Sequence, residues 1–153
     1  MHTIMQTPIG RLGIAVGGGK LLAIDFLSNP QRSIEPGDPL AREVHRQLRQ
    51  YFEQGQMRFS LPLGLQGTEF QQSVWRALCG IPPGQVQSYG AVARLLGSSA
   101  RAVGNACRRN PIPLVVPCHR VVSAAGIGGY GGATDGRRIE VKRWLLAHEG
   151  VTL

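Results

Sequence analysis

Residues 114–122 read LVVPCHRVV, and this stretch indicates both a local fold and a chemistry. Two short apolar runs flank four residues of different character, Pro117, Cys118, His119 and Arg120, which predicts a buried strand interrupted at these positions. A thiolate is a strong nucleophile, but a thiol with an ordinary pKa of about 8.5 is mostly protonated at neutral pH. An adjacent histidine, directly or through water, is a group that removes this proton, and a carboxylate can hold it in the useful tautomer.

The three cysteines leave two readings open. A cysteine that follows apolar residues, as Cys118 does, is usually a small core side chain, although the neighbouring His119 favours a nucleophile. An odd number of cysteines without a Cys-x-x-Cys spacing fits a reducing compartment better than a disulfide framework, and it predicts no metal site. We expect Cys79 and Cys107 to be unreactive.

Length and hydropathy bound the class of protein. The 153 residues, 42% of them apolar, suffice for one ordinary domain or for two small lobes that share a core. No apolar run approaches the roughly 18 residues of a membrane span, and the start of the chain lacks a signal pattern. We therefore expect a cytoplasmic protein that does not contact a membrane. We also expect a monomer that needs no cofactor.

The positive charge is unevenly distributed. The net charge is +8; residues 1–60 hold seven Lys and Arg against five Asp and Glu, whereas residues 61–153 hold ten against four. Fifteen of the seventeen cations are arginine, which suits bidentate contacts to phosphate. Composition alone favours a nucleic-acid partner no more than it favours a merely charged surface.

Residues 1–63 predict a small structural lobe. Residues 11–27 alternate as a hairpin around a turn at Gly17–Lys20, and a helix is expected from Asp38–Pro39 to about Gly55. Phe59, Leu61 and Leu63 alternate as a possible third strand. The fold class expected here is α+β: a small antiparallel sheet with a covering helix, followed by a mainly helical second domain over residues 68–153.

In that second domain the pattern predicts four helices. Thr68 has the spacing of a capping box for a helix that ends before Gly80. Ser88 can cap a short helix with Val92, Leu95 and Leu96 on its inner side. A turn at residues 97–99 then leads into a helix that ends at Asn110, a pairing typical of helix-turn-helix units. The last helix is expected over residues 138–148.

The helix before Asn110 has few large side chains. Its small residues include Ala100, Ala102, Gly104 and Ala106, and its only long side chains are Arg101, Arg108 and Arg109. One interpretation is a helix thinned for close packing within the protein. The other is a helix that lies against the DNA minor groove, which is only about 6 Å wide, whereas recognition helices usually read the major groove with long polar side chains.

The motifs together resemble one family. Around PCHR lie RAVG at residues 101–104, Asn110–Pro111, GYGG at 129–132 and LLAHEG at 145–150. Their order, and nearly their spacing, match those of one known family. This resembles the O6-alkylguanine-DNA alkyltransferases, also called methylated-DNA–protein-cysteine methyltransferases. The resemblance runs from about Thr68 to Gly150. It implies irreversible transfer of an alkyl group from O6-alkylguanine, extruded from double-stranded DNA, to Cys118 in a single turnover.

The same resemblance assigns roles to individual residues. It makes His119 the base that acts through water, Glu149 its buried partner, Tyr89 the contact to the departing oxygen and to a phosphate, and Asn110 the residue that positions the active-site segment. Arg101 takes the place of the extruded nucleotide. The resemblance further implies DNA contacts by Arg101, Ala102, Gly104, Arg108 and Tyr89, and a base pocket formed by Tyr130, Cys107, Val121 and Gly131.

Two departures and three alternatives accompany this interpretation. The glycine loop after Tyr130 is longer than the common family form, and Cys107 is smaller than the residue often found there, which leaves the range of alkyl groups open. The alternatives are a binding module that only flags the lesion, which Cys118 disfavours; a thiol hydrolase that uses Cys118, His119 and Glu149; and a helix-turn-helix regulator. A sequence-specific footprint would indicate the regulator.

Overall fold

The structure is a computed structural model, and it describes residues 2–28, 32–130 and 136–152. The chain divides into two compact units. One contains Met1–Leu65 together with Pro111–Pro113, and the other contains Gln66–Asn110 and Leu114–Leu153. In the described ranges, no helix is both long and apolar enough to cross a bilayer.

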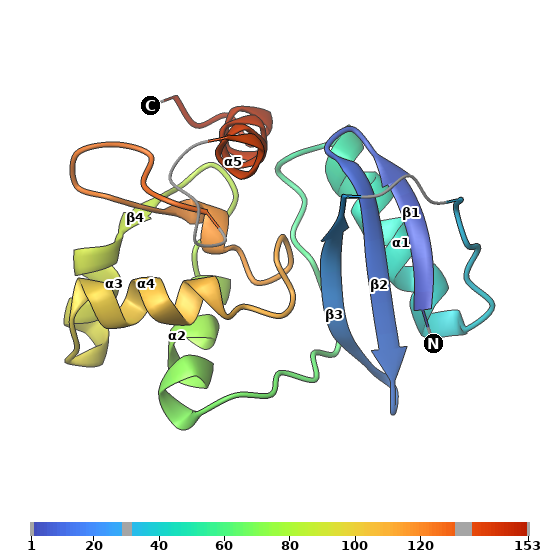
Figure 1. The fold of residues 1–153 in the computed structure, drawn as a ribbon, viewed down its shortest axis with the longest axis horizontal. Helices are drawn as coiled ribbons and strands as arrows, with labels where there is room; N and C mark the ends of the chain where they lie inside the picture. Colours follow the sequence, from blue (N-terminus) through green and yellow to red (C-terminus); the bar gives the residue numbers. More distant parts are fainter. Residues whose placement is uncertain (1, 29–31, 131–135, 153) are drawn as a thin grey trace. The chain divides into compact units, whose positions relative to one another are not determined.

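The first unit is a three-stranded antiparallel sheet covered by one helix (Figure 1). Its elements are β1 (His2–Thr7), β2 (Gly10–Gly17), β3 (Lys20–Leu27) and α1 (Pro39–Glu53). The predicted hairpin is confirmed as β2 and β3, and Leu12, Ile14 and Val16 alternate into the core with at most 4% of their surface exposed. Asp38 caps α1 as predicted, because its carboxylate accepts hydrogen bonds from two backbone amides of the first turn.

The third strand of this sheet is β1, and the prediction of a strand over Phe59, Leu61 and Leu63 is wrong. In that run, Leu63 forms only an isolated bridge with Leu21. Pro62 accounts for the difference, since it has no amide proton to give to a ladder. Its carbonyl accepts a single hydrogen bond from the Leu21 amide, at 2.8 Å.

The second unit is mainly helical. Its helices are α2 (Glu69–Cys79), α3 (Tyr89–Leu96), α4 (Ala100–Arg108) and α5 (Arg137–His148), with a short 3-10 helix at Cys118–Arg120. Two short parallel strands, β4 (Gln87–Ser88) and β5 (Val121–Val122), pair beside it. Thr68 and Gln71 form both halves of the predicted capping box, and Ser88 caps α3. The predicted α+β class, a small antiparallel sheet followed by a mainly helical part, is confirmed.

Two local predictions in this unit are wrong. Leu95 is 71% exposed, because Val92 and Ala93 define the buried face of α3 and a 100° rotation per residue carries Leu95 off it. The apolar run before Pro117 is a turn rather than a strand. Leu114 there has a φ of 74°, in the left-handed region, and only β5 after the polar residues is extended.

Candidate active site

The Cys118 thiol lies in a segment that two hydrogen bonds hold in place. Cys118 is the first residue of the 3-10 helix and is 6% exposed. The carbonyl of Val116 accepts both the Cys118 amide and Nδ2 of Asn110, each at 2.8 Å. Burial raises the pKa of the Cys118 thiol, while the Asn110 side chain and the Lys142 ammonium oppose the rise. The thiol therefore needs a base to become a nucleophile.

His119 and Glu149 form the buried pair that the resemblance implies. Nε2 of His119 lies 2.7 Å from Oε2 of Glu149, and both side chains are fully buried. Arg120 donates two hydrogen bonds to the same carboxylate, from Nε to Oε1 at 2.8 Å and from a terminal nitrogen to Oε2 at 3.0 Å. It also donates to the Ile81 carbonyl at 2.7 Å. Burial by itself would raise the pKa of Glu149, but the hydrogen bonds from His119 and Arg120 outweigh it and lower the pKa to about 2.

This arrangement fixes the tautomer of His119. An ionised carboxylate only accepts hydrogen bonds, so Nε2 of His119 must carry the proton. Burial lowers the pKa of His119 despite the neighbouring Glu149, which keeps the ring neutral at pH 7. Nδ1 is then the basic nitrogen, and within the described residues it is buried and has no hydrogen-bond partner. The base can therefore take a proton only through Nδ1.

Tyr89 stands at the edge of the same site. Its hydroxyl donates to the Gly129 carbonyl at 3.3 Å. Burial, with a smaller contribution from the thiols of Cys107 and Cys118, raises the pKa of Tyr89 to about 12. The phenol therefore stays protonated and able to donate.

Of the predicted base-pocket residues, two are buried in this unit and a third is half-buried. Val121 is fully buried, Tyr130 is 4% exposed and Cys107 is half-buried. Burial, and then the charge of Cys118, raise the pKa of Cys107 to about 12, in keeping with an unreactive thiol close to Cys118. Gly131 lies outside the described residues. Cys79 is exposed at the end of α2.

Sequence reasoning missed Lys142 and the partner of Arg120. Lys142 is fully buried on α5 and donates to the carbonyls of Val121 and Gly129, at 2.7 and 2.8 Å. A signal was present, since Lys142 follows Ile139 by three residues and precedes Leu146 by four, which places it on the apolar face of its helix. A lysine is almost never fully buried unless its charged group is paired.

The predicted DNA-binding helix is α4. Val103 and Ala106 face the core, and Nε1 of Trp75 on α2 donates to the Ala106 carbonyl at 2.9 Å. Arg101 and Arg108 are exposed. A Cβ added at Gly104 would meet no atom within 4 Å, so packing in the described structure does not require a glycine there. This disfavours the interpretation that α4 is thinned to pack within the protein.

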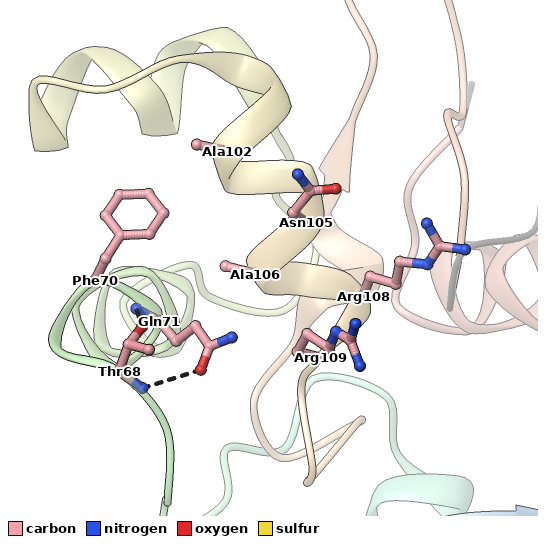
Figure 2. A pocket seen from close by; sticks show the side chains of 8 residues that line it. All are labelled: Thr68, Phe70, Gln71, Ala102, Asn105, Ala106, Arg108 and Arg109. Carbon is pink, nitrogen blue, oxygen red and sulfur yellow. Dashed lines mark hydrogen bonds between the residues drawn. The ribbon is translucent and has the colours of Figure 1, made fainter.

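A groove of about 470 Å³ runs between the start of α2 and α4 (Figure 2). Figure 2 shows Phe70 on the α2 side facing Ala102, and Arg108 and Arg109 at the far end of α4. Phe70 is only half-buried and lines this groove. The groove is therefore apolar at one end and basic at the other. In the described residues, no three His, Cys, Asp or Glu side chains gather as a metal site.

Family models match nearly the whole chain. The model described as the DNA binding domain of 6-O-methylguanine DNA methyltransferase matches residues 69–151, and the model described as the ribonuclease-like domain of the same proteins matches residues 1–65. A methylated-DNA–protein-cysteine methyltransferase of Methanosarcina acetivorans is 38% identical over 97% of each chain. The constitutive one of Bacillus subtilis is 36% identical over 99% of this chain and 96% of its own.

Solved structures agree with these matches. A crystal structure of Mycobacterium tuberculosis OGT in complex with DNA has a TM-score of 0.82 and 40% identity, and the match covers 95% of this chain and 90% of that one. The O6-methylguanine-DNA methyltransferase of Pyrococcus kodakaraensis gives a TM-score of 0.64 at 29% identity, over 99% of this chain and all of its own. On both sequence and structure, the chain belongs to the methylated-DNA–protein-cysteine methyltransferase family of DNA repair proteins.

Proposed function

We propose that this methyltransferase moves the alkyl group of O6-alkylguanine in DNA onto Sγ of its own Cys118, in one irreversible turnover. The observation that carries the proposal is the buried Glu149–His119 pair beside Cys118, which leaves Nδ1 of a neutral imidazole as the base. Cys118 is buried and O6 of guanine is hidden inside the base stack, so the damaged base must leave the duplex to reach the thiol.

The chemistry follows from these positions. Nδ1 of His119 takes the thiol proton through a water, and Glu149 stabilises the imidazolium. The thiolate attacks the alkyl carbon, a carbon–sulfur bond forms, and the carbon–oxygen bond breaks with its electron pair passing to guanine. The proton then returns from the imidazolium, relayed by water or by the Tyr89 hydroxyl, to the departing guanine. Water does not hydrolyse a thioether at neutral pH, so each molecule acts once.

In this proposal, α4 is the helix that binds DNA, and it lies along the minor groove of a duplex. Ala102 and Gly104 allow a close approach, and the open space beside Gly104 supports an external partner. Arg101 is exposed at the start of α4, where it can fill the space that the extruded nucleotide leaves. Arg108 contacts the phosphate backbone, which attracts arginine strongly.

The two parts of the chain have different roles. Residues 1–63 form a structural lobe, and residues 68–153 bind DNA and carry out the transfer. We expect the protein to act as a monomer on double-stranded DNA, in the cytoplasm or at the nucleoid.

The test is to follow a radiolabelled methyl group on O6 of one guanine in a duplex. Transfer predicts that the label moves from DNA to protein and stops at one label per protein molecule. Label released as methanol would indicate a thiol hydrolase instead. Tight binding with the label left on DNA would indicate a module that only flags the lesion.

A further inference from the structure

Leu114 has a backbone conformation that leucine rarely adopts. Its φ is 74°, and in the described parts of the chain it is the one residue other than glycine with a positive φ. In this region the side chain crowds the following carbonyl oxygen, which disfavours an ordinary L-residue by about five- to thirtyfold in population. The side chain of Leu114 is 1% exposed, so its apolar burial offsets that cost and holds the residue in this conformation.

The neighbouring prolines explain why the turn falls on Leu114. Residues 110–117 read NPIPLVVP. A proline fixes its own φ near about −65° and pushes the residue before it toward an extended conformation, so neither is suited to a left-handed turn. Only Leu114 and Val115 are neither proline nor followed by proline. Val115 is β-branched, which makes a positive φ still less favourable for it.

A hydrogen bond across this segment requires the turn. Nδ2 of Asn110 donates at 2.8 Å to the carbonyl of Val116, six positions further along the chain. Six extended residues would span about 20 Å, so the chain must reverse between the two groups. The Val116 carbonyl also accepts the Cys118 amide at 2.8 Å, and the Asn110 side chain forms a hydrogen bond with the Cys118 thiol. The closed segment therefore sets where Asn110 lies relative to the thiol.

We propose that Leu114 is a positioning residue for the transfer, whose left-handed turn holds the Asn110 amide on the thiol of Cys118. This rests on the proposed transfer to Cys118. The hydrogen bond from Asn110 opposes the rise that burial causes in the pKa of Cys118, because it favours the thiolate. Opening of the turn at Leu114 removes that donor from the thiolate and makes the thiol harder to ionise.

The first test compares the stability of Leu114→Ala with that of Leu114→Gly. Both variants lose the buried side chain that holds the turn, but only glycine adopts a positive φ without strain. We expect the glycine variant to be the more stable of the two, by about threefold in the folding equilibrium constant, although glycine normally destabilises. Val115→Ala and Val115→Gly are the matched control pair, at a residue whose φ is not positive, and there alanine should be the more stable.

The rate of transfer distinguishes positioning from stability. Transfer from a free O6-alkylated guanine base is measured by intact mass over a range of pH, so that DNA binding is not involved. In Leu114→Ala the turn opens, and the midpoint of the rate profile should move up by about half a pH unit or more, which is about threefold slower transfer at neutral pH. Leu114→Gly should restore the original midpoint, because the segment closes again without strain.

A second pair of variants keeps the interior filled and does not depend on the folding of the truncated variants. Leu114→Met and Leu114→Ile both retain an apolar side chain of nearly the same size. Isoleucine is β-branched and unsuited to a positive φ, so Leu114→Ile should lose stability and raise the midpoint. Leu114→Met should keep the original midpoint.

Three results would overturn the proposal. One is that alanine is more stable than glycine at Leu114 as well as at Val115, and another is that the methionine and isoleucine variants behave alike. The third is a midpoint that stays the same in Leu114→Ala and Leu114→Ile. If instead the unaltered protein transfers nothing, the proposed function fails, and the stability comparisons, which need no substrate, separate that failure from a failure at Leu114.

Discussion

Glu149 accepts the Nε2 proton of His119 at 2.7 Å in a fully buried pair, and this bond decides which nitrogen is the base. Glu149→Gln should slow transfer by roughly a hundredfold or more, since a glutamine amide has one accepting oxygen and cannot serve His119 and Arg120 together. It should also lower the free energy of unfolding by about 3–5 kcal/mol, because Arg120 loses its buried partner. Single-turnover kinetics and denaturant unfolding measure the two effects. Glu140→Gln, an exposed change on the same helix, should alter neither.

Glu149 should also make the stability of the protein depend on pH. Its pKa is lowered from 4.5 to about 2 in the folded protein, so its contribution is fully present above about pH 4.5 and is lost as the pH falls toward 2. The contribution is on the order of 3 kcal/mol. Unfolding titrations between pH 6 and roughly 2 should show this loss, and Glu149→Gln should remove most of it. Equal pH dependence in the two proteins would mean that Glu149 is not ionised in the fold.

Arg101→Ala should separate base extrusion from chemistry. Arg101 is exposed on α4, whereas Cys118 and His119 are buried, so the chemical step on a free alkylated base should be unchanged. Repair in a duplex should slow strongly, because extrusion costs a few kcal/mol and its placeholder is lost. Arg94→Ala on α3 removes an exposed arginine as a control and should repair at the original rate. Equal losses by Arg101→Ala on both substrates would contradict the proposed role.

Gly104→Ala should have opposite effects on stability and DNA binding. A Cβ at this position meets nothing within 4 Å, and alanine is favoured over glycine in a helix by about 1 kcal/mol, so the protein should become more stable. Binding to duplex DNA should weaken, since the added methyl group meets the floor of the groove. Thermal unfolding and a DNA titration measure the two. Unchanged affinity would place α4 away from the minor groove.

The sequence predicted the elements that local chemistry defines. Asp38, Thr68 and Ser88 each cap the expected helix, because side chain and amide lie within one turn of chain. The alternation of buried and less buried side chains along β2 was equally predictable. The same approach failed where a single residue overrides a pattern, as Pro62 does, and at β1, where Thr3 is buried beside two apolar residues without alternation.

The site was only partly predictable for a related reason. Cys118 and His119 are adjacent in sequence, and the family resemblance supplied Glu149 from 30 residues away. That Arg120 binds the same carboxylate depends on how α5 packs against the 3-10 helix. Lys142 reaches Val121 and Gly129 by the same packing, and no local pattern records which carbonyls it meets.

The central claim is that Cys118 receives the alkyl group, and intact-mass analysis with peptide mapping tests it most directly. The protein is mixed with an excess of duplex that carries one O6-methylguanine. We predict a gain of one methyl group per molecule, found on the peptide that contains Cys118, and no further gain with time. Cys118→Ser should fold and bind the same duplex without gaining mass, because a hydroxyl is much harder to ionise. A methyl group on Cys79 or Cys107, repeated turnover, or undiminished transfer by Cys118→Ser would contradict the account.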